Sequence, residues 1–381
     1  MAKTNLLPPT SGAAATIARP VASPVASPGD TRQTPRTAPL GIGVVGAGYW
    51  GPKLIRNFQA SADACVRGVC DRDPARLASV GQGDPTIGLH TELEGLLDDP
   101  SIEAIAIATP VDTHFELAKR VLMSGRHVLI EKPIAASIEE AETLVALAEE
   151  RGLTLLVDHT FLYHPAVEKM KELLDDGTLG APLHFDSVRI NLGLFQPDIN
   201  VLWDLAPHDL SILSWLMPEP PVSVSATGAS HWGKGTASVA YLSLAYPGNF
   251  IAHVHVSWLA PVKVRSVILS GTKRMMIYDD NQVLEKVKVY DRGIAESSAE
   301  SSTESGSRDD EHRHRVDYRM GDMHAPHIAG DEALAKEVAD FVRCVRTGET
   351  PRSNGQTALA VVRILEKAQE SLMQGGAPVA V

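Results

Sequence analysis

The chain has 381 residues, a formal net charge of −12 and an isoelectric point near 5.6. That length suits two domains, each long enough to bury its own core. The acidic balance argues against nucleic acid or an anionic membrane as the main partner, because a phosphate-binding surface needs clustered lysines and arginines.

The chain carries no sign of secretion or membrane insertion. Its three cysteines show no paired spacing, which predicts neither a disulfide framework nor a zinc site and fits a reducing cytoplasm. No stretch reaches the roughly 18 consecutive apolar residues of a spanning helix. Residues 1–38 are rich in Ala, Pro, Ser and Thr and lack the apolar core of a signal peptide, so we expect a disordered leader.

From Leu40 onward, strand and helix patterns alternate. Apolar strands are expected at 42–45, 65–70, 104–108, 127–130 and 154–157. Helices are expected after Gly51 and at 74–79, 114–124 and 138–151. This alternation predicts an α/β domain over residues 39–158, built on a doubly wound parallel sheet.

After His159 the pattern changes to an α+β domain that would extend to residue 381. Helices are expected at 166–175 and 207–216, and strands at 184–192, 222–227, 238–245, 250–258 and 263–270. The long β-branched runs favour a large, open, mostly antiparallel sheet. Because an uncovered apolar sheet face is a usual route to oligomers, we expect a homodimer or homotetramer.

Two further segments complete the chain. Residues 294–308 are rich in Ser and Glu and predict a mobile insertion between strands. Helices at 332–346 and 357–372 are expected to pack on one domain or across both. The histidines near this insertion, His312, His314, His324 and His327, lack a frame of carboxylates, so no metal site is predicted.

A glycine turn joins the first strand to the first helix. The free N–H groups and the dipole of a helix N-terminus favour an anion there. Gly46 permits the turn, Gly48 lets the backbone approach a pyrophosphate, and Gly51 lets the helix pack closely on the sheet. Asp71, 20 residues past Gly51, ends the second strand and would accept hydrogen bonds from a ribose.

This acid favours NAD over NADP, because a 2′-phosphate would be repelled by the carboxylate of Asp71. Arg72 directly follows and leaves NADP as the alternative, since a guanidinium can meet a phosphate.

The chemistry of hydride transfer needs a proton acceptor and a cation that holds the reacting oxygen. Lys132 directly follows a strand and therefore lies at the edge of the sheet where ligands collect. Asp204 and His208 are four residues apart, which places both on one side of a helix. His208 suits the proton transfer, and Asp204 or Asp209 could orient it; the alternatives are a helix cap for Asp204 and a buried histidine for His208.

Taken together, these motifs resemble the Gfo/Idh/MocA family, named from glucose-fructose oxidoreductase and inositol dehydrogenase. The resemblance spans nearly the whole chain after residue 38 and is carried by residues 46–51, 108–114, 131–133, 159–163 and 203–209.

The resemblance implies a Rossmann domain followed by a domain for substrate binding and oligomerisation. It implies catalytic roles for Lys132, Asp204 and His208. The candidate cofactor-binding residues are Gly46, Gly48, Tyr49, Trp50, Gly51, Asp71, Arg72, Thr109, Pro110, His114, Glu131 and Lys132. For His114, packing at a helix start is the alternative. The candidate substrate contacts are Tyr163, Asn191, Gln196 and Asp198.

We therefore expect a cytoplasmic, NAD(P)-dependent oxidoreductase that acts on a ring hydroxyl or ketone of a sugar, nucleotide sugar or cyclitol. Two alternatives remain open. The chain could be a non-catalytic sensor on the same fold, or an enzyme that never releases its NAD.

Overall fold

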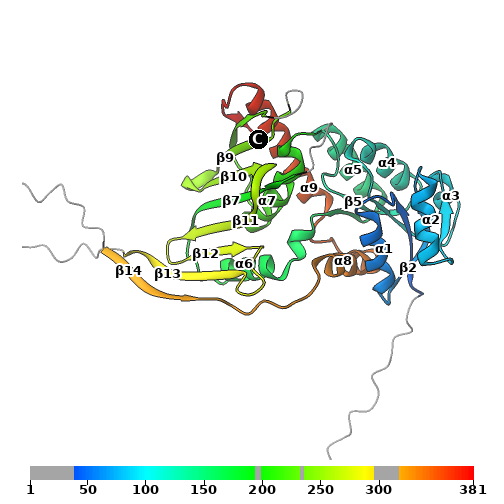
Figure 1. The fold of residues 1–381 in the computed structure, drawn as a ribbon, viewed down its shortest axis with the longest axis horizontal. Coiled ribbons are helices and arrows are strands. Elements are labelled where there is room, and N and C mark those ends of the chain that lie inside the picture. The colour runs from blue at the N-terminus through cyan, green and yellow to red at the C-terminus, as the bar shows by residue number, and fades with distance from the viewer. Residues whose placement is uncertain (1–37, 194–198, 232–235, 296–316) are drawn as a thin grey trace, which may run out of the picture. The chain divides into compact units, whose positions relative to one another are not determined.

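The computed structural model describes residues 38–193, 199–231, 236–295 and 317–381, which contain two β-sheets (Figure 1). The first sheet has six described strands in the order β3-β2-β1-β4-β5-β6, and every pair is parallel. The strands are β1 (Leu40–Val45), β2 (Ala64–Cys70), β3 (Gly88–His90), β4 (Ala104–Ile107), β5 (His127–Glu131) and β6 (Leu155–Asp158).

Helices cover both faces of this sheet, which confirms the doubly wound prediction. They are α1 (Gly51–Ala60), α2 (Pro74–Gly83), α3 (Glu94–Leu97), α4 (His114–Met123) and α5 (Ile138–Arg151). Alternate residues of β4 enter different cores: Ala104 and Ala106 pack with α1, whereas Ile105 and Ile107 pack with α4 and α5. Burial on both faces explains why these strands are apolar throughout.

The second sheet has nine described strands in the order β14-β13-β12-β11-β7-β10-β9-β8-β15. Its pairs are antiparallel except for β7 with β10, so the expected mostly antiparallel sheet is confirmed. The strands are β7 (Pro182–Leu192), β8 (Ser223–Ala229), β9 (Val239–Ala245), β10 (Ile251–Ser257), β11 (Leu259–Gly271), β12 (Met275–Asp279), β13 (Val287–Ala295), β14 (Asp317–His324) and β15 (Val379–Ala380).

One face of the second sheet packs on helices. These are α6 (Pro165–Asp175), α7 (Val201–Leu216) and α9 (Gly355–Met373), which share one apolar core with the inward residues of the strands (Figure 1). Along β10, Ala252 and Val254 are fully buried, whereas Ile251 on the opposite face is 51% exposed.

The last helices return to the first sheet. α8 (Ala333–Thr347) packs on α1, where the rings of Phe58 and Phe341 meet at 6.3 Å. α9 contributes Leu359 to the core of the first sheet and Leu365 to the core of the second. The predicted packing across both domains is thus observed, while a single boundary at residues 158 and 159 stays a prediction.

The start of α7 corrects the sequence prediction. The helix was expected from Pro207 but begins at Val201, because the side chain of Asn200 accepts hydrogen bonds from two backbone N–H groups of the first turn. Pro207 therefore lies inside the helix instead of opening it. No helix in the described part of the chain is long and apolar enough to cross a membrane.

Candidate active site

The glycine turn leaves one stretch of backbone open. Gly46 has a φ of 97°, and a Cβ there would lie 2.5 Å from the carbonyl oxygen of Ala108. A Cβ on Gly51 would lie 2.0 Å from the carbonyl oxygen of Gly46, so both positions require glycine. A Cβ on Gly48 would meet only the guanidinium of Arg76, at 3.5 Å. The backbone at Gly48 is therefore accessible to a ligand.

Asp71 fixes the inner side of this turn. Its carboxylate accepts hydrogen bonds from the backbone N–H of Ala47 at 2.7 Å and of Asp73 at 2.8 Å. Arg76, on the first turn of α2, lies 3.6 Å from the same carboxylate, whereas Arg72 is exposed. Arg76, which was not among the predicted site residues, is thus a cation beside Asp71.

The aromatic residues of the turn connect it to the end of β6. The ammonium of Lys53 lies 3.8 Å from the ring centre of Tyr49 and 4.1 Å from that of Trp50. The indole N–H of Trp50 donates to the carboxylate of Asp158, while Tyr49 is 85% exposed. Trp50 is thus held between two strand ends, next to the open backbone.

Lys132, at the end of β5, meets Asp204, in the first turn of α7. The ammonium of Lys132, directly after β5, donates to the backbone oxygen of Asp204 at 2.8 Å and lies 3.7 Å from its carboxylate. The indole N–H of Trp258 donates to that carboxylate at 2.8 Å. Asp204 lies in the first turn of α7 but does not cap it, since Asn200 does.

His208 lies one helical turn beyond Asp204, and its ring meets Phe161 edge-on at 5.3 Å. Its Nδ1 atom is buried without a hydrogen-bond partner. Burial lowers the pKa of His208 well below its usual range, and the nearby charges of Lys132 and Arg189 lower it further. The imidazole is therefore neutral at pH 7.

Asp209 faces another partner. Its carboxylate accepts two hydrogen bonds from the guanidinium of Arg189, at 2.6 and 3.2 Å, and both side chains are almost fully buried. This ion pair joins α7 to β7, so the carboxylate of Asp209 binds Arg189 and does not orient His208.

The turn after β4 is tied to the turn after β5. The ring nitrogens of His114 lie 2.8 Å from the carbonyl oxygen of Pro133 and 2.9 Å from that of Thr109. His114 is 1% exposed, while Pro110 is exposed and Thr109 is partly exposed. His114 thus holds together two turns that carry candidate site residues.

Buried carboxyl groups gather behind the strand ends. Glu131 accepts a hydrogen bond from the backbone N–H of Lys132 at 2.9 Å. Glu337, on α8, is fully buried, and neither carboxyl oxygen has a hydrogen-bond partner. Burial raises the pKa of Glu337 and of Glu131 well above the usual range, and the charge of Asp158 raises both further.

The Glu337→Gln variant should change how stability depends on pH. Folding raises the pKa of the Glu337 carboxyl above its unfolded value of about 4.5. The protonated carboxyl therefore contributes its full stability to the folded state below about pH 4.5, and this stability is lost as the pH rises through the folded pKa. Thermal unfolding from pH 5 to pH 9 should show the variant gaining stability relative to the native protein toward alkaline pH. Glu150→Gln, on the exposed end of α5, is the matched control; a pH-independent difference for Glu337→Gln would contradict the expectation.

The four candidate substrate residues have different positions. Tyr163 is buried and its hydroxyl donates to Asp340 at 2.8 Å, so it is engaged by α8. Asn191 lies two residues after Arg189 on β7, which places both on the same face of the sheet. Gln196 and Asp198 lie outside the described residues.

Some residues near the site were missed. His159, directly after β6, is 1% exposed, and burial and then the charge of Lys132 lower its pKa to about 3. The rule that identified Lys132, a polar residue at the carboxyl end of a parallel strand, would have found Asp158 and His159 as well. Nothing in the sequence indicated Trp258, which approaches from the other sheet.

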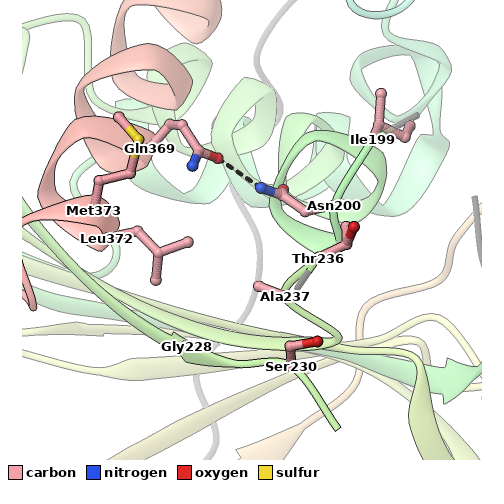
Figure 2. Close-up of a pocket in the computed structure, with 9 residues that line it drawn as sticks. All are labelled: Ile199, Asn200, Gly228, Ser230, Thr236, Ala237, Gln369, Leu372 and Met373. Atoms are coloured by element: carbon pink, nitrogen blue, oxygen red, sulfur yellow. Dashed lines mark hydrogen bonds between the residues drawn. The ribbon is translucent and has the colours of Figure 1, made fainter. Parts of the chain in front are cut away.

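A pocket of about 390 Å³ lies beside the start of α7 (Figure 2). Asn200 and Gln369 meet at its edge through a hydrogen bond of 2.5 Å. The lining is neutral, so it offers no acid or base for hydride transfer; the lining residues are Ile199, Asn200, Gly228, Ser230, Thr236, Ala237, Gln369, Leu372 and Met373. Within the described ranges, no group of His, Cys, Asp and Glu side chains could hold a metal ion.

Comparison with known proteins matches this architecture. UDP-N-acetylglucosamine 3-dehydrogenase of Acidithiobacillus ferrooxidans is 28% identical over 313 residues, or 80% of this chain and 88% of that protein. A solved structure of that enzyme superimposes with a TM-score of 0.73 at 25% identity, covering 89% of this chain and 99% of the other. Inositol 2-dehydrogenase 2 of Saccharopolyspora erythraea is 34% identical over 192 residues, or 49% of this chain and 56% of that protein.

Two family models match the first sheet and part of the second. The oxidoreductase family with an NAD-binding Rossmann fold matches residues 40–159. The GFO/IDH/MocA C-terminal domain matches residues 167–277. The expected family is thereby confirmed, and the chain belongs to the Gfo/Idh/MocA family of NAD-binding oxidoreductases.

Proposed function

We propose that this protein is an NAD-dependent dehydrogenase or ketoreductase that acts on a ring hydroxyl or ketone of a sugar, nucleotide sugar or cyclitol. The observation that carries the proposal is the contact between Lys132 and Asp204, one helical turn from a neutral His208. The similarity to a nucleotide-sugar dehydrogenase and to an inositol dehydrogenase supports the substrate class.

The residues of the glycine turn fit a dinucleotide. The open backbone at Gly48 would hold the pyrophosphate at the N-terminus of α1, and Asp71 would accept from the adenosine ribose. Bound NAD supplies a hydride acceptor, and its reduced form a hydride donor. Arg76 lies close enough to Asp71 to meet a 2′-phosphate, which leaves NADP as the alternative cofactor.

Each of the three catalytic candidates has a distinct role. The ammonium of Lys132 would hold the substrate oxygen and stabilise negative charge that develops on it. His208 would take the hydroxyl proton during oxidation and return it during reduction. Asp204, fixed by Trp258, would keep Lys132 in place and accept from a neighbouring substrate hydroxyl.

We also propose that the protein is a cytoplasmic homo-oligomer. Cys65, Cys70 and Cys344 are free thiols, which supports a reducing compartment. The open face of the second sheet exposes Ile251 and Tyr241, which supports a second copy as its cover.

A panel of sugars, nucleotide sugars and cyclitols incubated with NAD should give an increase in absorbance at the reduced-nicotinamide band for at least one of them. Native mass spectrometry of the purified protein tests the alternative that the enzyme never releases its cofactor. In that case the mass of the protein would be increased by the mass of the retained dinucleotide. Binding of NAD without turnover of any substrate in either direction would favour the non-catalytic sensor instead.

A further inference from the structure

Four buried nitrogen atoms around His208 have no hydrogen-bond partner. They are Nη1 of Arg189, Nε of Arg265, Nδ1 of His208 and Nδ1 of His159. Arg189 is only 2% exposed, so its Nη1 has little access to bulk water. A buried donor without an acceptor costs about 1–3 kcal/mol, more when it is charged. The two guanidinium nitrogens can only donate, so they indicate a missing acceptor, whereas the two imidazole nitrogens donate or accept according to the tautomer.

These donors share one region of the fold. Arg189 on β7 and Arg265 on β11 are direct partners in the antiparallel ladder, so their side chains leave the same face of the sheet. The guanidinium of Arg189 lies 4.5 Å from the ring centre of Phe161, and His208 meets that ring from α7. The two arginines therefore lie beside the proposed proton acceptor.

The carboxylates in this region do not balance its cations. Arg189 is paired with Asp209. Asp280 serves two cations, Arg265 at 3.4 Å and Lys286 at 3.5 Å. Two carboxylates thus face three cations, which leaves one positive charge in excess.

We propose that this arginine cluster, Arg189 and Arg265, binds an anionic group of the substrate close to the reacting carbon. The inference rests on the proposed function and narrows it to acidic substrates. The shared chemistry is an anionic oxygen group, which can be the carboxylate of a sugar acid or a phosphate of a nucleotide sugar. Arginine suits both because its planar fork pairs with two oxygens at once.

Binding of an anion would also change the pKa of His208. In the free protein, four cationic or histidine side chains lower its pKa, and an anion beside them would raise it again. The groups that face this region from the surrounding elements are Lys132, His159, His164, Arg189, Asp204, Asp209, Arg265, Tyr278, Asp280 and Lys286. Because kcat/KM reports the free enzyme and kcat the complex, the acidic limb of kcat should lie at higher pH for acidic substrates only.

The test compares two pairs of ligands that differ by one carboxylate: D-glucose with D-glucuronate, and UDP-glucose with UDP-glucuronate. Calorimetry on the NADH-saturated protein should show more than about tenfold tighter binding, either of the acidic member within a pair or of both UDP-sugars relative to both free sugars. A preference within either pair assigns the site to a ring carboxylate. Tight binding of both UDP-sugars with no preference within either pair assigns it to the diphosphate.

Variants of Arg265 test whether this residue binds the anionic group. Arg265→Gln should reduce the affinity for the anionic ligand by roughly 10- to 100-fold, and Arg265→Lys should restore part of it. Arg274→Gln is the matched control, because Arg274 pairs with Asp291 at 3.5 Å at a distance like that between Arg265 and Asp280. Thermal unfolding of each variant confirms that it is folded.

Equal affinity for all four ligands, including no measurable binding of any, overturns the inference. So does an equal loss of neutral and anionic ligands in Arg265→Gln. The proposed function fails separately: absence of turnover with retained preference for the anionic ligand would leave the anion site in place and remove the dehydrogenase assignment.

Discussion

Lys132→Ala should lower kcat by about 10²- to 10³-fold, the range that a donor stabilising a developing negative charge contributes. The ammonium of Lys132 is 2.8 Å from the backbone oxygen of Asp204 and its charge lowers the pKa of His208, so the substitution removes a cation from between these two candidate residues. Steady-state kinetics with the best substrate of the panel gives kcat. Fluorescence titration with NADH gives the dissociation constant of the cofactor.

Binding of the dinucleotide should change little, because the glycine turn and Asp71 hold the other end of the molecule. Lys169→Ala is the matched control, since Lys169 lies on α6 and pairs with the exposed Glu172 in the same helix. Activity retained in Lys132→Ala would refute the assigned role.

Asp209→Ala should lower the free energy of unfolding by about 3–5 kcal/mol, because it leaves the buried guanidinium of Arg189 without its carboxylate. Most domains are stable by only about 5–15 kcal/mol, so this single change removes a large share. Urea unfolding followed by circular dichroism measures it. Glu172→Ala breaks the exposed pair with Lys169 and should cost only about 0–1 kcal/mol.

The double variant Arg189→Met with Asp209→Leu tests the cause of this loss of stability. If the loss arises from an unpaired buried charge, the double variant should recover most of the stability, since apolar replacements of buried ion pairs are often neutral. A double variant as unstable as Asp209→Ala would instead assign the loss to packing around α7.

Sequence alone determined the parts of this protein whose cause is local. Alternating apolar strands and amphipathic helices gave the parallel sheet and the end of β5 that presents Lys132. The glycine spacing predicted the turn at Gly46 and Gly51, because the absence of a Cβ there follows from chain geometry over a few residues. The family resemblance was found from the same short motifs.

Other features depended on partners far away in the chain. Trp258 donates a hydrogen bond to Asp204, which lies 54 residues earlier in the chain. Asp209 accepts its hydrogen bond from Arg189 and does not orient His208. Whether a polar side chain is buried, and what satisfies it, depends on which elements pack around it, and no local pattern records that. Only the tertiary structure therefore decided that the cations near His208 exceed their carboxylates and that Glu337 is buried behind the first sheet.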